Sequence, residues 1–426
     1  MRLRQIVRLP TAVSLFTGAG GLDLGLEAAG FRVAIAVEFD HKACETLRAN
    51  RRWTVYEGDI HQLTTPRICE LSALSPEEPD LLVGGPPCQP FSKSGYWQFG
   101  DTKRLRDPRA DTLRAYLRVL RDLRPRAFLL ENVEGLAYAG KDEGLRHLRN
   151  TIKAINARIG TEYSFAVAKL NAADYGVPQT RERVIIVGSR DGHAFRFPQT
   201  THADPDATTD RFASRQQAWL RSWDAIGDLE DDDDPMLAVG GKWGGLLPSI
   251  PEGQNYLWHT DRGGGMRLFG WRRRYWGFLL KLAKGRPAWT VQAQPGTGIG
   301  PFHWRSRKLS ARELSRIQTF PDDWKIVGSR ADAQRQLGNA VPPLLAEVLG
   351  REIRRQLLGH RLPNLPLRFT VHSRPRMPRP QSLQPVRKKY LKYVGAHSAH
   401  PGTGMGFAMR ARHRAKNGRS RRSSAR

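Results

Sequence analysis

One of three cysteines, Cys88, stands in the segment LLVGGPPCQPFSKSG, where an apolar run gives way to a loop of glycine and proline. Most lone cysteines are small buried apolar residues. The prolines on both sides of Cys88, however, fix the backbone where nothing apolar demands a sulfur atom. An ordinary thiol, with a pKa of about 8.5, becomes a thiolate nucleophile only near positive charge or a helix terminus. The segment is therefore compatible with a catalytic nucleophile as well as with a packing residue.

Two further motifs carry groups that could act beside such a thiol. Glu131 ends the apolar segment RAFLLENV, where a carboxylate can hold a proton for a reacting group or, with Asn132, simply cap a helix. Arg181 and Arg183 are two residues apart in PQTRERVIIVG, so an extended backbone places them on one face. Two guanidinium groups on one face suit a phosphate or a carbonyl oxygen. A solvated strand face or a structural ion pair is the alternative.

A glycine-rich turn, FTGAGGLDLG, follows the apolar segment TAVSLF. Such a turn between strand and helix lets a ligand approach the backbone and offers free helix amides, although it also allows close helix packing. Glu38 and Asp59 follow the next two strand-like segments. A carboxylate at the first position suits a ribose diol, and Asp59 could accept a hydrogen bond from an exocyclic amine. Together they predict an adenosine-containing cofactor, either a dinucleotide or S-adenosylmethionine; otherwise both acids are strand-end caps.

These groups all lie at the ends of strand-like segments. Strands are predicted at 11–16, 32–40, 53–60, 79–85, 126–133 and 183–189, and helical patterns lie between several of them. This alternation predicts an α/β fold with a doubly wound, mostly parallel sheet. Ligands bind such sheets at the carboxyl ends of the strands. The turn, the two acids, the cysteine and Glu131 are therefore expected along one edge.

The pattern changes between about 190 and 305. Glycines cluster there, an acidic run spans 230–234, and eight of the 11 tryptophans lie between 219 and 304, which together predict a small irregular second domain. Helical patterning returns at 308–324 and at 341–359. After His360 the chain is rich in proline, arginine and serine, so we expect a disordered tail.

The charge and the cysteine content limit the classes of protein to which this chain can belong. The formal charge is +28, and residues 361–426 hold 17 Lys and Arg without an acid. This balance fits a polyanionic partner, with nucleic acid as the leading candidate; a solvated basic surface is the alternative. Three cysteines without CxxC spacing argue against disulfides and zinc, and no metal is expected. The absence of a long apolar segment or signal peptide predicts a cytoplasmic protein without membrane contact.

The order and the amino-acid sequences of these motifs resemble those of the DNA (cytosine-5) methyltransferases of bacterial type II restriction–modification systems. The resemblance rests on SLFTGAGGLDLGLEAAGF, AVEFD, GDI, GGPPCQPFS, LLENVEG, PQTRERV, ARELSRIQTFPDDW and GNAVPP, and it covers about residues 12–190 and 286–358. It implies a Rossmann-like catalytic domain in two parts, 1–190 and 286–360. A target-recognition domain over 191–285 would lie between them, and the basic tail 361–426 is not part of the family core.

The resemblance also implies roles for single residues. Cys88 would add to carbon-6 of a cytosine, Glu131 would hold the ring at nitrogen-3, and Arg183 would bind the carbonyl oxygen. Arg181 would shape the site or reach a phosphate. S-adenosylmethionine would be the methyl donor. Its pocket would be formed by Phe16, Gly18, Gly20, Glu38 (ribose), Asp59 (adenine amine), Pro87, Asn339 and Ala340.

The implied substrate is double-stranded DNA with the target base flipped out. The loop after Cys88, with Gly95 and Gly100 as hinges, would then close over the base. Groove-facing candidates are Arg262, Arg267, Trp271, Arg272, Arg273, Arg274, Tyr275 and Trp276, although most tryptophans are expected in the core of this domain. The tail would add salt-dependent phosphate affinity or be dispensable. A monomer and a functionally paired restriction endonuclease are further expectations.

Three other functions remain open at this point. An RNA cytosine-5 methyltransferase of the same architecture shares the motifs, although the recognition segment of about 100 residues favours DNA. A nucleotide-dependent oxidoreductase would explain the glycine turn but not the loop cysteine, ENV or the paired arginines. A non-catalytic DNA-binding protein with this fold would not need every motif residue, and all are present.

Overall fold

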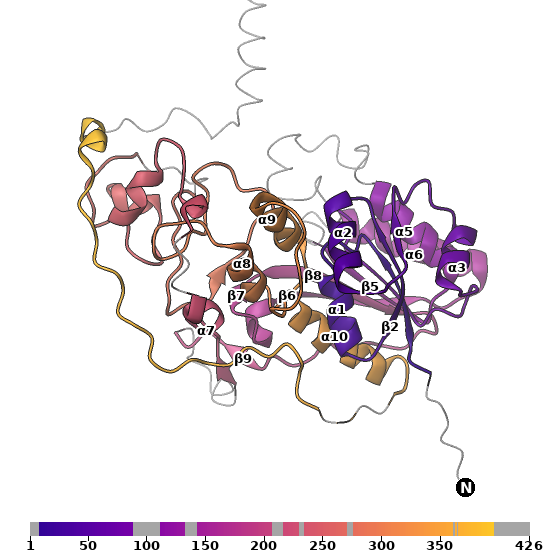
Figure 1. Cartoon of the computed structure of the whole chain (residues 1–426). Coiled ribbons are helices and arrows are strands. Elements are labelled where there is room, and N and C mark those ends of the chain that lie inside the picture. The colour runs from indigo at the N-terminus through magenta and orange to yellow at the C-terminus, as the bar shows by residue number, and fades with distance from the viewer. Residues whose placement is uncertain are drawn as a thin grey trace, which may run out of the picture.

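A seven-stranded sheet forms the centre of the larger part of the molecule (Figure 1). The computed structural model describes residues 8–87, 111–132, 143–206, 216–229, 234–270, 276–360, 363 and 365–395. The strands are β1 (Thr11–Leu15), β2 (Arg32–Glu38), β3 (Val55–Glu57), β4 (Leu81–Gly84), β5 (Ala127–Asn132), β6 (Ser164–Asn171) and β8 (Glu182–Ser189). Their order is β3-β2-β1-β4-β5-β8-β6, and β8 alone runs opposite to the other six strands. The predicted doubly wound, mostly parallel sheet is confirmed.

Helices cover both faces of this sheet, which explains why its central strands are apolar without alternation. On one face lie α1 (Gly21–Ala28), α2 (His41–Asn50) and α10 (Pro343–Gln356); on the other lie α3 (Thr65–Ser72), α5 (Asp111–Leu123) and α6 (Glu143–Ile159). Successive strand residues serve opposite faces: Leu81 packs with the first group and Leu82 with the second. The α1 and α10 helices pack together although over 300 residues separate them.

Four of the longer elements were absent from the sequence prediction, and α6 is one of them. Most residues of β6 are half-buried because this strand lies at the edge of the sheet, so its sequence lacks a continuous apolar run. The short helix α3 and the helix α9 (Arg330–Asn339), which is largely polar, also lack a strong apolar period. By contrast, the predicted apolar face of α5 is buried at Tyr116, Leu117, Leu120 and Leu123. The sequence also predicts Asp107 and Pro108 as the cap of this helix, and both lie outside the described residues.

The second region, left in Figure 1, consists of short elements. They are the strand pairs β9 (His202–Ala203) with β10 (Gln217–Ala218) and β7 (Gln179–Thr180) with β11 (Ala288–Trp289), helix α7 (Ser222–Ile226), and the 3-10 turns η5 (Ala172–Tyr175), η7 (Gly227–Leu229), η8 (Pro235–Leu237), η9 (Gly244–Ser249) and η10 (Tyr256–His259). Its core is small and partly aromatic: Leu246, Leu247, Ile250, Tyr256, Leu268, Leu279, Phe302 and Tyr390. Helix α8 (Ala311–Ile317) then leads back through α9 to α10.

The C-terminal segment differs from the sequence prediction. Residues 365–395, here called the strap, run from α10 across to the second region and end in the 3-10 turn η11 (Lys388–Tyr393), yellow in Figure 1. The prediction of disorder from residue 361 was wrong for this segment, since Phe369 and Tyr390 are buried in two separate cores. Two isolated aromatic residues produce no periodic apolar pattern in the sequence. The burial of Phe369 and Tyr390 could therefore not be predicted from periodicity. The tail from 396 onward lies outside the described residues.

Candidate active site

The glycine turn after β1 is open at one position and tightly packed at the others. Phe16 and Gly18 have positive φ values of 56° and 58°, and a Cβ atom built on Gly18 would meet nothing within 4 Å. At Gly20 a Cβ would lie 2.8 Å from the Leu47 side chain, and at Gly21 only 2.1 Å from the Val341 carbonyl oxygen. The turn therefore serves both purposes that the sequence left open. Gly18 borders open space where a ligand could approach, whereas Gly20 and Gly21 allow close packing.

Glu38 ends β2 opposite this turn with its carboxylate fixed. Oε2 accepts the Gly18 amide at 2.6 Å, and Oε1 accepts the amides of Phe39 and Asp40 at 2.8 Å. Burial raises the pKa of the Glu38 carboxyl, and these backbone hydrogen bonds oppose that rise. The adjacent Phe39 ring is 76% exposed at the same strand end. Sequence analysis did not select Phe39, although a large apolar residue between two acids after a strand is a usable signal.

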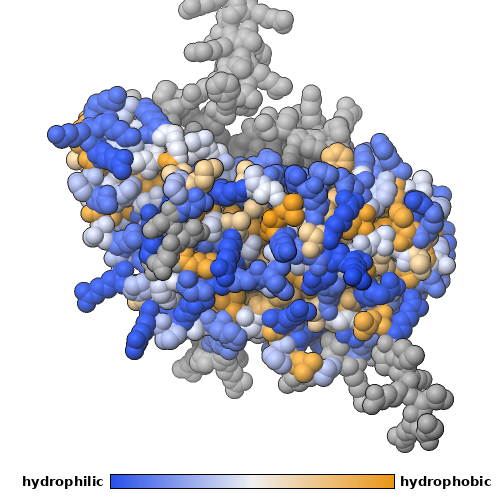
Figure 2. All heavy atoms as spheres, in the orientation of Figure 1, coloured by the Kyte–Doolittle hydropathy of each residue, from blue (hydrophilic) through white to orange (hydrophobic). Residues whose placement is uncertain are grey.

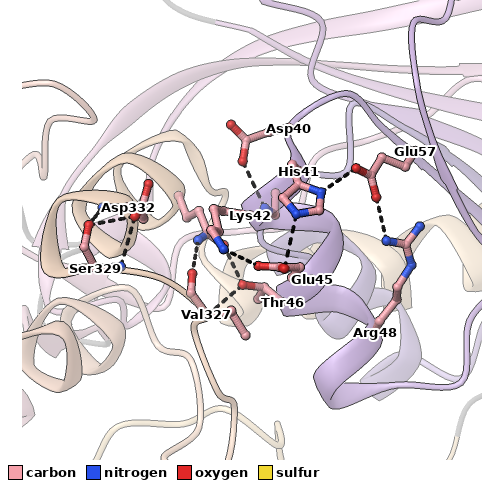
Figure 3. A network of polar contacts seen from close by, with 12 residues as sticks. Asp40, His41, Lys42, Glu45, Thr46, Arg48, Glu57, Val327, Ser329 and Asp332 are labelled. Carbon is pink, nitrogen blue, oxygen red and sulfur yellow. Dashed lines mark hydrogen bonds and ion pairs between the residues drawn. The ribbon is translucent and has the colours of Figure 1, made fainter.

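A polar network fixes this strand end against its neighbours (Figure 3). Asp40 caps α2 by accepting the Ala43 amide at 2.9 Å, and it also pairs with Arg335 of α9. His41 lies 2.6 Å from Glu57 at the end of β3. The Glu57 carboxylate raises the pKa of His41 by accepting a hydrogen bond from it. The ends of β2 and β3 are thus joined to α9, which leads to the predicted pocket residues Asn339 and Ala340.

The remaining predicted pocket residues lie around the same edge. Asp59, half-buried just beyond β3, accepts the His61 amide at 2.9 Å. Asn339 is exposed at the end of α9, whereas Ala340 is buried beside it. The Val341 carbonyl that follows packs against Gly21, so this turn lies at the start of α1. Residues more than 300 positions apart in the sequence therefore border one site.

Glu131 and Arg183 form an ion pair where β4 and β5 end. Their Nε–Oε1 distance is 2.8 Å, and both side chains are largely buried, at 11% and 15% exposure. The second carboxylate oxygen of Glu131 lies against Gly85, since a Cβ atom there would be 2.9 Å from Oε2. Asn132 also donates from Nδ2 to the Pro86 carbonyl at 3.4 Å. The pair therefore borders the backbone that leads into Cys88.

The strands carrying the cysteine loop and the glutamate are neighbours, with Gly84 opposite Leu130. Pro87, exposed beyond β4, accepts a hydrogen bond from the Thr112 hydroxyl of α5 at 3.2 Å. Cys88 comes next, and the loop from it through residue 110, Gly95 and Gly100 included, lies outside the described residues. The sequence hypothesis that an acid would lie beside the cysteine loop required neighbouring strands, and they are neighbours.

Arg181 has a different setting from Arg183. It is 1% exposed, and it donates to the carbonyl oxygens of Gly338 at 2.8 Å and Val291 at 3.3 Å. Burial, assisted by the nearby Arg183 cation, lowers the pKa of its guanidinium well below the usual value. These contacts fit the first role suggested by the resemblance, shaping the site, since the guanidinium faces protein carbonyls.

The candidate groove residues are only partly described. Arg262 and Arg267 are exposed, whereas the other five candidates between 271 and 275 lie outside the described residues. Trp276 is 52% exposed, with its ring 5.6 Å from that of the exposed Trp289. Trp223 and Trp304 are buried together, with ring centroids 6.1 Å apart. The tryptophans of the second region thus divide between core and surface.

Two further findings bound the chemistry. Within the described ranges, no three His, Cys, Asp or Glu side chains are grouped so as to hold a metal ion. Nor does any helix there have the length and apolar character needed to cross a membrane. The groups that converge are a carboxylate–guanidinium pair beside a cysteine loop and an acid-bordered opening at a glycine turn. This set suits group transfer to a ring that offers a nitrogen and a carbonyl oxygen.

Comparison with known proteins gives the family. A family model described as C-5 cytosine-specific DNA methylase matches residues 11–355. The type II methyltransferase M.SacI of Streptomyces achromogenes is 41% identical over 369 residues, covering 81% of this chain and 93% of that protein. The type II methyltransferase M.AquIA of Picosynechococcus sp. is 43% identical over 222 residues, covering 51% of this chain and 88% of that protein.

A solved structure supports the same architecture. The DNMT2 mutant of Spodoptera frugiperda aligns with a TM-score of 0.54 at 17% identity, covering 81% of this chain and 99% of that one. At this identity the likeness concerns the fold alone, which is that of the seven-stranded sheet with its helices.

Proposed function

The chain belongs to the C-5 cytosine-specific DNA methylases of the type II class, and from this premise we propose how it acts. It transfers a methyl group from S-adenosylmethionine to carbon-5 of one cytosine in a specific duplex DNA sequence, through a covalent adduct on Cys88. The observation that carries the mechanism is the Glu131–Arg183 pair of 2.8 Å, bordering the Gly85–Pro87 backbone that leads into Cys88.

The residues at the β1 and β2 ends fit an adenosine cofactor. The space beside Gly18 is open, and the ring of Phe39 offers an exposed apolar face next to the fixed carboxylate of Glu38. We therefore assign Glu38 to the ribose, Asp59 to the adenine amine, and Phe16, Gly18, Gly20, Pro87, Asn339 and Ala340 to the pocket. When bound, S-adenosylmethionine supplies an electrophilic methyl group.

The protein groups supply the activation of cytosine. The Cys88 thiolate adds to carbon-6, while Glu131 holds nitrogen-3 by a proton or hydrogen bond and Arg183 holds the carbonyl oxygen. Carbon-5 then becomes nucleophilic and forms a bond to the methyl carbon as the sulfur–methyl bond breaks. Solvent water takes up the carbon-5 proton, and the electron pair of that bond reforms the double bond between carbon-5 and carbon-6 as the thiolate leaves carbon-6. Arg181 keeps the strand that carries Arg183 in place through its carbonyl contacts.

A base inside a duplex cannot reach this edge of the sheet, so the cytosine is flipped out. Residues 191–285, which form most of the second region, select the sequence from the groove. The modification protects host DNA from a restriction endonuclease with the same site, and the enzyme acts as a monomer in the bacterial cytoplasm.

Methyl transfer from labelled S-adenosylmethionine to duplex DNA and to transfer RNA tests the substrate. We expect label in DNA, and bisulfite sequencing of DNA from expressing cells should show protected cytosines within one sequence context. Label found only in RNA would overturn the assignment in favour of an RNA methyltransferase of the same fold.

A further inference from the structure

The strap ends in a turn that is part of the second region's core. Tyr390 of η11 is 2% exposed, and its ring stacks on Trp243 at 5.6 Å with an angle of 17°. Its hydroxyl donates to the Lys242 carbonyl at 3.0 Å. A large side chain held by both packing and a hydrogen bond fixes the backbone on either side of it. The turn η11 therefore has one position on the protein.

The rest of the strap is fastened at intervals. Arg374 pairs with Asp228 at 2.8 Å, and its amide donates to Asp224. Further on, the Gln381 amide donates to Glu252 and the Gln384 amide to the Pro248 carbonyl, both within 3.1 Å. These bonds tie the strap to successive parts of the second region, so η11 is held at the end of a fixed path.

The surface of η11 is strongly basic. Five exposed cations surround the buried Tyr390, and we call them the basic patch: Lys242, Arg387, Lys388, Lys389 and Lys392. Lys242 lies 4.8 Å from the Trp243 ring and 4.5 Å from that of Tyr393. Among the described residues, no carboxylate forms an ion pair with any member of the patch. Cations gathered at one place on a surface repel one another, and a polyanion would relieve that repulsion.

The position of the patch suggests which polyanion. Figure 1 shows η11 at the upper edge of the second region, and the carboxyl ends of the parallel strands also point to the upper side of the molecule. In Figure 2, drawn in the same orientation, strongly hydrophilic side chains project at this corner. DNA whose target base reaches the strand ends would therefore extend along the side that carries the patch.

We propose that the basic patch binds the phosphate backbone of duplex DNA outside the recognised sequence, and that Tyr390 is the anchor that seats it. Ammonium groups act as point charges and carry no base preference, so the contact strengthens binding without reading sequence. Counterion release makes such a contact strongly dependent on salt. This inference rests on the proposed function, since it needs a DNA substrate.

The experiment compares two full-length variants that each lose two exposed cations of the strap. Arg387→Gln with Lys388→Gln removes charge from the patch, while Arg376→Gln with Arg379→Gln removes charge from the strap before η11. Dissociation constants for a duplex containing the methylated site are measured between about 50 and 200 mM salt. The slope of log affinity against log salt should fall by about 0.9 for each phosphate that the protein no longer neutralises, and only in the patch variant.

The length of DNA flanking the methylated site shows where the basic patch contacts the duplex. Wild-type protein should bind more tightly as the duplex is lengthened beyond the site, and the patch variant should gain less. An unchanged salt slope in the patch variant, an equal weakening in the control variant, a weakening independent of flank length, or a weakening seen only with duplex RNA would each overturn the inference. Failure of the wild-type protein to methylate any duplex would instead refute the proposed function.

Discussion

The sheet region and the second region are stabilised in opposite ways. In the sheet, neighbouring strands pair in register over long stretches, as β5 does with β8 from Ala127 to Asn132. In the second region, two-residue strands and 3-10 turns leave stabilisation to side chains: a buried Lys284–Glu252 ion pair at 2.5 Å and a bidentate Arg221–Asp224 pair. The part to which we assign the chemistry is held by backbone order, and the part to which we assign DNA selection is held by individual contacts.

This difference predicts where a single substitution is felt. In the sheet region, many backbone hydrogen bonds remain when one side chain is removed. In the second region, each side chain supplies a larger share of the contacts that stabilise the small core. Chemistry and DNA selection should therefore be separable by mutation, and stability effects should stay local. Five predictions test these expectations, in order of falling effect.

The largest effect is expected for Cys88→Ala. Removing the nucleophile should lower methyl transfer by about 10⁴-fold or more, because the remaining groups cannot activate carbon-5 without the adduct. Affinity for duplex DNA, measured by fluorescence anisotropy, should be unchanged. Retained activity would refute the mechanism. Loss of DNA binding would contradict the expectation that chemistry and DNA binding can be separated by mutation.

Glu131→Gln should lower kcat by about 10²-fold to 10³-fold, since an amide cannot give nitrogen-3 a proton. The matched control is Glu182→Gln on β8, an exposed acid that pairs only with Lys169 among the described residues. Steady-state kinetics at saturating DNA should separate the two variants. Equal kcat values would show that the Arg183 ion pair of Glu131 is structural.

Tyr390→Ala should destabilise the second region by about 3 kcal/mol, because a buried aromatic ring is removed from a small core. Tyr390→Phe keeps the ring and should cost only about 1 kcal/mol, for the hydrogen bond to Lys242. Hydrogen exchange measured by mass spectrometry should show faster exchange at residues 244–259 and no change in β1, β4 and β5. Equal acceleration in the strands would mean that the two regions unfold together.

Asp23→Asn should stabilise the sheet region at high pH. Asp23 is fully buried in α1, and burial raises its pKa from 3.8 to about 7 although a hydrogen bond with Ser14 opposes the rise. Such a group favours folding below about pH 4, and that stability is lost as the pH rises through 7.

The variant should therefore match the wild type near pH 4 and exceed it at pH 8 by roughly 3 kcal/mol in urea denaturation. Glu27→Gln is the control, because the Glu27 carboxylate has partners in Arg51 and Trp53 and its neutralisation should destabilise the fold. A wild-type stability that does not fall between these pH values would contradict the raised pKa.

The smallest effect is expected at His41. Its pKa is raised by the hydrogen bond to Glu57, so its contribution is present at low pH and is lost as the pH rises through that raised value. An NMR titration should give a pKa above 6.5, and Glu57→Gln should return it toward that ordinary value. Exposure keeps the effect on stability small. An unshifted pKa would mean that the network in Figure 3 does not hold in solution.

The same difference decides what the sequence could predict. Six strands of the sheet, and the meeting of the candidate site residues at the strand ends, could be predicted from apolar runs and glycine turns. These signals depend only on residues that are neighbours in the sequence. Tyr390 and Phe369 joining two separate cores did not, because each depends on a surface formed elsewhere in the chain. Likewise, Arg181 resembles Arg183 in sequence, and only the carbonyls of Val291 and Gly338 distinguish their settings.

Those carbonyl contacts of Arg181 bear on how the protein is synthesised. A ribosome delivers Arg181 long before it delivers Val291 and Gly338, and α10, which covers one face of the sheet, comes later still. A nascent chain that stops short of residue 338 leaves the guanidinium without both acceptors, and a buried cation without partners is costly. The surroundings of Arg181 are thus completed only after residues 191–285, to which we assign DNA selection, have been translated. A chain that ends within the second region therefore lacks both of these contacts.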